Sequence, residues 1–175
     1  MNPTLMPIFS RRSIRKYTGE PVDEGAINDL LEAGMSAPSA CAKDPWRFIV
    51  LRSTRLRRKI AAGLPNGKML ADAALGLAVC GDMRVAHGGE LSYLIQDCSA
   101  AIQNILLAAS MLGFGACWLG VHPREDRVTL LRELLKLPEP VLPVAVIAIG
   151  RPAEVLPART RLISGYIHSE TWESP

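Results

Sequence analysis

Hydrophobic side chains recur along this chain in runs that alternate between helical and strand spacing. Residues 21–34 place Ile27 and Leu30 at helical spacing after Pro21, which suits a first helical turn. Residues 46–51 alternate and are rich in β-branched and aromatic side chains, which predicts a strand. Further helices are predicted at 56–62, 96–112 and 124–135, and further strands at 75–80, 116–121 and 144–149.

Helices alternate with strands through most of the sequence, which favours an α+β or α/β layered fold. A length of 175 residues is enough to bury a hydrophobic core, and no repeat, low-complexity tract or linker divides it. We therefore expect a single domain that covers residues 1–175.

The segment 96–112 is the longest helical pattern, and its apolar residues occupy almost the whole circumference. A helix of this kind is buried on all sides, in the centre of a domain or at a subunit interface. Residues 151–175 contain few candidates for the core and have the character of an arm that needs a surface to lie on. Together these two features predict an obligate homodimer.

The composition is that of an ordinary globular protein, with 49% hydrophobic and 21% charged residues. A net charge of +3 is too small for a protein that coats nucleic acid, so we expect no nucleic-acid partner. No stretch has the roughly 20 apolar residues of a membrane span, and the N-terminus lacks the pattern of a signal peptide. We therefore expect no membrane partner.

The four cysteines contain no CxxC pair, and the three histidines are scattered. Free cysteine in apolar surroundings behaves as a small hydrophobic residue. We therefore expect reduced thiols in a cytoplasmic protein, without a disulfide framework and without a metal site.

Positive charge is concentrated in residues 11–17, where three arginines and a lysine surround Ser13. Arginine offers planar pairs of donors that suit a phosphate or the carbonyl edge of a heterocycle. The segment alone leaves three interpretations open: an anion-binding site, a solvated basic terminus and a nucleic-acid-binding arm. No aromatic side chains lie between the arginines to support the last of these.

Sequence motifs of several enzyme classes are absent. The chain contains no GxSxG, HExxH or Walker motif, and the pair Gly113 and Gly115 precedes a predicted strand instead of following one. No trio of serine, histidine and acid stands out. If the protein is an enzyme, a cofactor therefore carries the demanding chemistry, and we name no catalytic side chain.

Seven segments, in the right order and spread over almost the whole chain, resemble the FMN-dependent nitroreductase family. The resemblance implies a central mixed sheet flanked by helices and a homodimer with two FMN sites at its interface. The long helix would lie in that interface, and the C-terminal arm would reach the partner subunit. The matching segments are 11–17, 37–48, 96–109, 112–120, 137–138, 149–154 and 159–161.

The basic N-terminal segment matches the part of the family that grips FMN. The resemblance implies that Arg11, Arg12, Ser13 and Arg15 contact the phosphate, the ribityl chain and the pyrimidine carbonyls. A cation beside N1 and O2 stabilises the negative charge of the reduced flavin ring. We expect Arg15 to take this position.

Two later segments match further contacts. Arg159 and Arg161 match the distal phosphate-binding pair of the family, although a solvated basic tail has the same pattern. Leu119 and Gly120 match a main-chain segment beside the isoalloxazine, where glycine permits close approach. The neighbouring Trp118 is expected to pack in the core.

The loop after the first long helix matches the family segment that passes the flavin edge, usually from the other subunit. Pro38, Ser39 and Ala40 stand at the matching positions. Asn66 stands where the family tends to place a polar contact with the flavin.

The same loop departs from the family at two positions. Ala42 and Asp44 stand where an asparagine and a glutamine are usual. Alanine forms no side-chain hydrogen bond, and a carboxylate only accepts one. A negative charge near the ring disfavours its reduced form, so we expect an altered redox potential. Cys41 could approach the flavin, although packing is the more common role of cysteine.

We therefore expect an NAD(P)H-dependent FMN oxidoreductase that passes electrons to a small electron-poor acceptor, such as a nitroaromatic compound or a quinone, with ping-pong kinetics. Two alternatives remain open. One is a flavin carrier or redox sensor without turnover, and the other is a specialised relative with dehalogenase-like or flavin-fragmenting activity. The sequence does not decide between NADH and NADPH.

Overall fold

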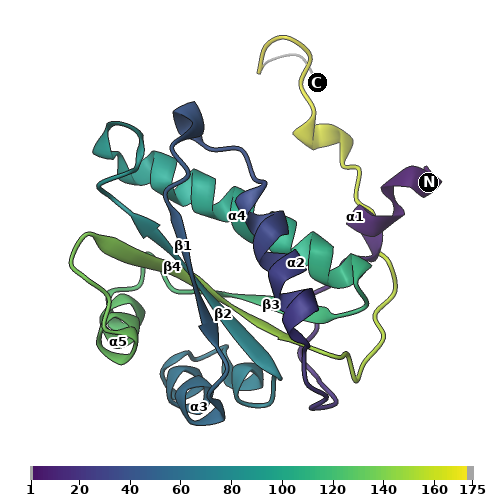
Figure 1. Ribbon diagram of the computed structural model, residues 1–175. Coiled ribbons are helices and arrows are strands. Elements are labelled where there is room, and N and C mark those ends of the chain that lie inside the picture. Colours follow the sequence, from purple (N-terminus) through teal and green to yellow (C-terminus); the bar gives the residue numbers. More distant parts are fainter. Residues whose placement is uncertain (1, 173–175) are drawn as a thin grey trace.

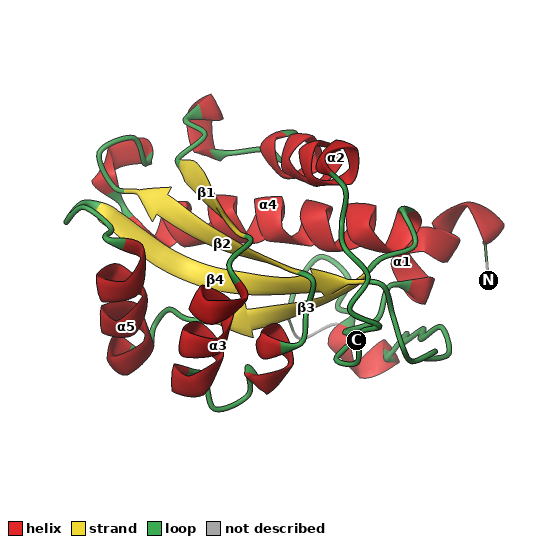
Figure 2. Cartoon of the chain, turned by 60° about the horizontal axis from the view of Figure 1, so that its bottom comes forward, coloured by secondary structure: helices red, strands yellow, loops and turns green. Residues whose placement is uncertain are grey.

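The computed structural model describes residues 2–172 and has a central sheet between two layers of helices (Figures 1 and 2). The strands pair in the order β1-β2-β4-β3, and every pair is antiparallel. β1 and β3 are therefore the edge strands, whose outer main-chain groups face away from the sheet. The strand bounds are β1 (Trp46–Leu51), β2 (Leu75–Asp82), β3 (Gly115–Gly120) and β4 (Val141–Gly150).

Helices cover both faces of this sheet (Figure 2). α2 (Glu24–Met35) and α4 (Leu91–Met111) lie on one face. α3 (Thr54–Gly63) and α5 (Glu125–Leu135) lie on the other. The short α1 (Met6–Ser10) contacts α4. The predicted layered α+β architecture is confirmed.

The pairing of the sheet differs from the mixed pattern that the family resemblance implies. β4 runs between β2 and β3 and is antiparallel to both, so the four strands contain no parallel pair. The parallel component is a single bridge between Ser13 and Ala116. It is made by the basic N-terminal segment as it crosses the edge of β3.

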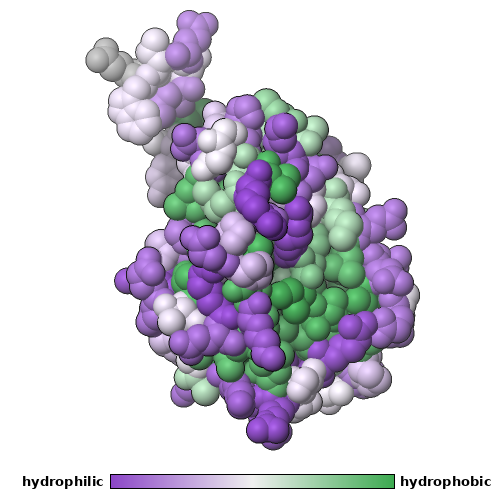
Figure 3. Space-filling model, turned by 60° about the vertical axis from the view of Figure 1, so that its left-hand side comes forward, coloured by the Kyte–Doolittle hydropathy of each residue, from purple (hydrophilic) through white to green (hydrophobic). Residues whose placement is uncertain are grey.

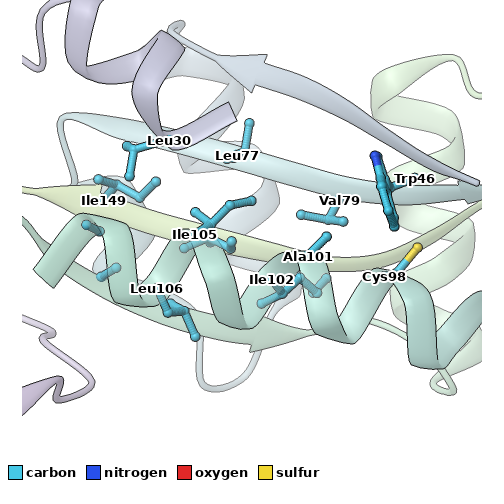
Figure 4. Packing of buried hydrophobic residues seen from close by; sticks show 14 of the residues in the cluster. Leu30, Trp46, Leu77, Val79, Cys98, Ala101, Ile102, Ile105, Leu106 and Ile149 are labelled. Atoms are coloured by element: carbon cyan, nitrogen blue, oxygen red, sulfur yellow. The ribbon is translucent and has the colours of Figure 1, made fainter. Parts of the chain in front are cut away.

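Two hydrophobic clusters join the layers. Figure 4 shows the first, in which Ile105 of α4 is fully buried between the sheet and α2. A Cβ atom at Gly34 of α2 would stand 2.8 Å from Ile105 Cδ1, so glycine permits the close approach of the two helices. The second cluster fills the opposite face around Ile60, Leu131 and Val146. Complete burial of such a side chain stabilises the fold by about 1.5–3 kcal/mol.

Element boundaries follow local signals. Asp23 caps α2 by accepting a hydrogen bond from the main-chain N–H of Ala26 at 2.9 Å. The strand predicted at 46–51 has the observed bounds. The helix predicted from residue 96 instead begins at Leu91, because Leu94 is also fully buried and extends its apolar face toward the N-terminus.

α4 and the C-terminal tail leave apolar surface uncovered. Met111 is 69% exposed and Leu112, just after α4, is 40% exposed. Of the two predicted places for this helix, the centre of a domain is therefore wrong at its C-terminal end, and a subunit interface stays a prediction. Within residues 2–172, no element covers these two side chains. Residues 151–172 contain no buried residue, which confirms a core-poor tail, and 173–175 lie outside the described residues. The last part of this tail, in yellow in Figure 1, stands away from the body of the molecule, and a part of the chain projects in the same way at the upper left of Figure 3.

Within residues 2–172, no helix has the length and apolar character needed to cross a membrane. The same residues bring together no group of three or more His, Cys, Asp or Glu side chains that could hold a metal ion. Three of the free cysteines are buried. Burial raises the pKa of the Cys80 and Cys98 thiols to about 12, so both are neutral.

Candidate functional site

The N-terminal segment lies across the edge of β3. The main-chain N–H of Ile14 donates to the carbonyl of Ala116 at 3.0 Å. Ile14 packs directly on Gly115, where a Cβ atom would stand 2.6 Å from Ile14 Cγ2. A glycine at the start of β3 therefore permits this crossing, which carries Arg15 beyond the edge strand.

Two side chains hold the main chain on either side of Arg15. The Tyr17 hydroxyl donates to the carbonyl of Ile14 at 2.7 Å, and its burial raises the pKa of the phenol well above its ordinary value. Glu154 Oε1 accepts from the main-chain N–H of Arg15 at 2.6 Å and of Lys16 at 3.2 Å. The carboxylate thus binds the main chain, and the Arg15 guanidinium is left to donate to the Ser13 carbonyl at 3.2 Å.

The tail returns to lie beside this segment. The main-chain N–H of Ala153 donates to the carbonyl of Lys16 at 2.8 Å, and that of Arg159 donates to the carbonyl of Phe9 at 2.9 Å. The guanidinium of Arg12 donates to the carbonyl of Pro157. These contacts bring residues from opposite ends of the chain to one place.

The two segments enclose a cavity of about 450 Å³. No carboxylate is among the residues that line it, so its positive charge is not neutralised within the cavity. Several guanidinium groups in one cavity are suited to binding a phosphate, which accepts paired hydrogen bonds from them. All six residues that the sequence predicts as FMN contacts in the basic segment and the tail line the cavity: Arg11, Arg12, Ser13, Arg15, Arg159 and Arg161.

A second cavity of about 210 Å³ follows the edge of β3, and Arg15 lines both cavities. Asn66, Leu119 and Gly120 line it, as the sequence predicts. A Cβ atom at Gly120 would have no neighbour within 4 Å, so a ligand has open access to the main chain there.

Two other residues of this second cavity were expected elsewhere or not considered. Trp118 is 38% exposed and lines the cavity, so its predicted core position is wrong. The reason is that β3 is an edge strand, so no further strand lies beside Trp118 to help cover its side chain. Cys117 also lines the cavity, and burial raises the pKa of its thiol, which is therefore neutral.

Sequence analysis also missed Arg127, which lines the second cavity with Arg15. Its Nη1 atom donates to the Gly120 carbonyl at 2.8 Å. The spacing of Arg127 after Leu119 and Gly120 could have pointed to it, because the first turn of α5 directly follows β3.

The predicted flavin-edge loop is not part of either cavity. Pro38, Ser39 and Ala40 line neither of them, so a single chain does not bring them to the arginines. The main-chain N–H of Ala40 donates to Asp97 Oδ1 of α4 at 2.9 Å, which holds the loop at the opposite end of that helix from α1 (Figure 1).

The rest of this loop is tightly wound. Cys41, Ala42 and Asp44 all have positive φ angles, a conformation that non-glycine residues rarely adopt. Asp44 Oδ1 accepts from the Ser39 hydroxyl at 2.5 Å, which closes the loop on itself. Cys41 is exposed, so its expected packed role is wrong.

The donor set fits FMN. The larger cavity has the cationic donors that a phosphate needs, and Ser13 adds a hydroxyl suited to a ribityl chain. The smaller cavity combines an accessible edge-strand main chain with the side chains of Leu64 and Trp118. Arg127 Nε is buried there, and no group in residues 2–172 accepts a hydrogen bond from it, which leaves a donor for a ligand.

The fold and this site define a layered α+β protein with an arginine-lined place for an anionic, planar ligand. The model of the nitroreductase family matches residues 8–65 and 61–151 of the sequence. These segments make up more than half of the chain. The protein therefore belongs to the nitroreductase family.

Individual relatives agree over almost the full length. A candidate NADH dehydrogenase/NAD(P)H nitroreductase of Archaeoglobus fulgidus is 40% identical, and the match covers 98% of this chain and 100% of that protein. The crystal structure of a protein of the same description from Parabacteroides distasonis has a TM-score of 0.92 at 37% identity, covering 98% of this chain and 100% of that one. A candidate nitroreductase of Desulfovibrio desulfuricans, solved in complex with FMN, has a TM-score of 0.84 at 34% identity and covers 98% of each chain.

Proposed function

We propose that this protein is an FMN-dependent oxidoreductase that takes electrons from NAD(P)H and passes them to a small electron-poor acceptor, such as a nitroaromatic compound or a quinone. FMN, when bound, supplies a two-electron relay between donor and acceptor at one face, which gives ping-pong kinetics. The protein holds and orients the cofactor and tunes its electrostatic surroundings.

A single observation carries the proposal. A cavity lined by five arginines continues, through Arg15, into a second cavity along an open sheet edge. The first suits a phosphate and the second a planar ring, in the order in which FMN presents them. The FMN complex of the Desulfovibrio relative supports the same choice of cofactor.

The arginines divide between the two parts of the cofactor. Arg11, Arg12, Arg159 and Arg161 line the larger of these two cavities and not the smaller one, and they would bind the phosphate. Arg15 would stand at the pyrimidine edge, where a cation stabilises the reduced ring.

The smaller cavity would hold the flavin ring. Leu119 and Gly120 would contact it through their main chain, Asn66 through its amide and Trp118 through its indole. No Asp, Glu or His lines either cavity in the described part of the chain. The side chains there are suited to holding the ring rather than to transferring protons.

We also propose a homodimer, in which the partner subunit completes each site. A cavity of about 410 Å³ between α2 and α4, where Leu107, Met111 and Leu112 supply much of the lining, is an uncovered apolar surface. The tail adds exposed apolar side chains, including Leu162 at 87% and Tyr166 at 81%. A second subunit would cover both surfaces and bring its own loop 38–40 to the flavin edge.

The absorption spectrum of the purified protein tests the cofactor and the activity together. We expect a yellow protein with close to one flavin per chain that bleaches when NADH or NADPH is added without oxygen. A quinone or a nitroaromatic compound should then restore the colour. A colourless protein that FMN cannot reconstitute would overturn the proposal, and a yellow protein that neither nucleotide bleaches would exclude NAD(P)H as the electron donor.

Sedimentation of the same sample tests the dimer.

A further inference from the structure

Arg127 is held at one end of its guanidinium and has an unused donor at the other. Its Nη1 atom donates to the carbonyl of Gly120, the last residue of β3. Its Nε atom is buried and has no hydrogen-bond partner among the described residues. A buried donor without a partner costs about 1–3 kcal/mol, so proteins rarely leave one unmet.

The charge of Arg127 is not neutralised by a neighbour. Among the described residues, the arginines in ion pairs are Arg47, Arg52 and Arg84, and Arg127 is in none. The two acidic residues that precede it on α5 form no hydrogen bond with it, and no carboxylate lines its cavity. Arg15, a second cation, lines the same cavity as Arg127.

A ligand of this cavity therefore meets two guanidinium groups, one from the N-terminal segment and one from α5. The cavity is small and partly closed to water, which strengthens electrostatic interactions inside it. An acceptor with negative charge in this cavity would satisfy both the Arg127 charge and its Nε–H. The isoalloxazine ring gains such charge when it is reduced.

We infer that Arg127 is a second cationic contact of the flavin ring, which stabilises the reduced form of the cofactor and fixes the Gly120 main chain beside it. The inference rests on the proposed function, because it takes FMN as the ligand of the site. It assigns to the site a cation that the basic segment 11–17 does not supply.

A purely structural role would confine Arg127 to anchoring the end of β3. Two substitutions separate the roles, because Arg127→Gln keeps a donor for the Gly120 carbonyl but removes the charge, whereas Arg127→Lys keeps the charge. Arg124→Gln is the matched control, since Arg124 is an exposed residue of the same segment, outside both cavities, and loses the same charge.

The decisive measurement is the two-electron midpoint potential of bound FMN, from anaerobic titration against dyes of known potential. For Arg127→Gln we expect reduced FMN to bind about tenfold more weakly relative to oxidised FMN, which lowers the potential by about 30 mV. Arg127→Lys should retain most of the potential, and Arg124→Gln should retain all of it.

An unchanged potential in Arg127→Gln would overturn the inference, and so would equal falls in the Gln and Lys variants. If Arg127→Gln does not fold, the Nε–H resonance of Arg127 in the unaltered protein decides instead, because it should shift when FMN is added and resist exchange with water. An Nε–H resonance that does not respond to bound FMN would also refute the contact. If the unaltered protein does not bind FMN, the proposed function is refuted as well. FMN binding by the unaltered protein is measured first, so this outcome is distinguished from a failure of the inference about Arg127.

Discussion

The Tyr17 hydroxyl donates a hydrogen bond to the main-chain carbonyl of Ile14 over 2.7 Å. The same hydroxyl lies 3.2 Å from the carbonyl of Ala148 on β4. The N-terminal segment is thus folded back on itself and tied to the sheet on either side of Arg15. The position of that arginine depends on a half-buried phenol that lines neither cavity.

Replacing Tyr17 with phenylalanine should lower the free energy of unfolding by about 1–3 kcal/mol, because the Ile14 carbonyl loses its buried donor. FMN affinity should fall with it, since the frame around Arg15 loosens. Urea unfolding and flavin titration measure the two effects, and unchanged values of both would contradict the role of Tyr17.

The Tyr17 contribution should also depend on pH. Burial raises the pKa of the folded phenol above the ordinary value of 10.0. Below pH 10 the Tyr17 phenol is protonated in both the folded and the unfolded protein, and its full contribution to the free energy of unfolding is present. Above pH 10 the unfolded chain releases the proton first, so stability falls, and the difference between the native protein and Tyr17→Phe should shrink.

Replacing Gly115 with alanine tests the crossing of the N-terminal segment over β3. The new Cβ would stand 2.6 Å from Ile14 Cγ2, so the segment must shift outward, at a cost of about 1–3 kcal/mol. We expect weaker FMN binding although residue 115 lines neither cavity. Gly25→Ala is the control, because Gly25 is an exposed residue of α2 outside both cavities, and the added carbon meets only the Asp23 carboxylate, at 3.2 Å. Equal FMN affinity in the two variants would argue against the proposed coupling.

The two cavities should respond differently to flavins with and without a phosphate. Arg159→Met or Arg161→Met should weaken FMN binding by about 10- to 100-fold, because a charge-assisted contact with the phosphate is lost. Riboflavin, which has no phosphate, should bind with unchanged affinity. Arg15→Ala should weaken both ligands or lower the redox potential, because Arg15 lines both cavities. Fluorescence titration with each flavin checks the pattern, and a uniform loss for both ligands in the tail variants would place the phosphate elsewhere.

Asp44→Asn tests the loop that the sequence marks as unusual. Asparagine tolerates the positive φ of 48° at this position and can keep the contact with the Ser39 hydroxyl. Removal of the negative charge should raise the potential of bound FMN if the partner subunit brings this loop to the ring. No change in potential would mean that the loop lies away from the flavin.

Sequence patterns predicted the layers well because each element has its own hydrophobic face. The strand at 46–51 and the capped start of α2 at Asp23 are local features that need no knowledge of the rest of the chain. The basic segment and the tail pair Arg159 and Arg161 were predicted as one site from the resemblance, and they do line one cavity.

What the patterns could not predict depends on contacts between distant segments. The exposure of Trp118 follows from the place of β3 at the sheet edge, which strand spacing does not reveal. The roles of Glu154 and Arg127 arise from hydrogen bonds to main-chain atoms of other elements. Such bonds leave no periodic signal in the sequence.

The edge position of β3 has a consequence for how this protein can diversify. In the proposed site the phosphate half of FMN would be bound by arginine side chains, each of which a single substitution can remove. The ring half offers main-chain groups at Leu119 and Gly120, which persist when the neighbouring side chains change. Variation at Asn66, Trp118 and the 38–44 loop can therefore alter which acceptor is reduced while the cofactor is retained. An engineer who seeks new acceptors should randomise these positions and keep the arginines fixed.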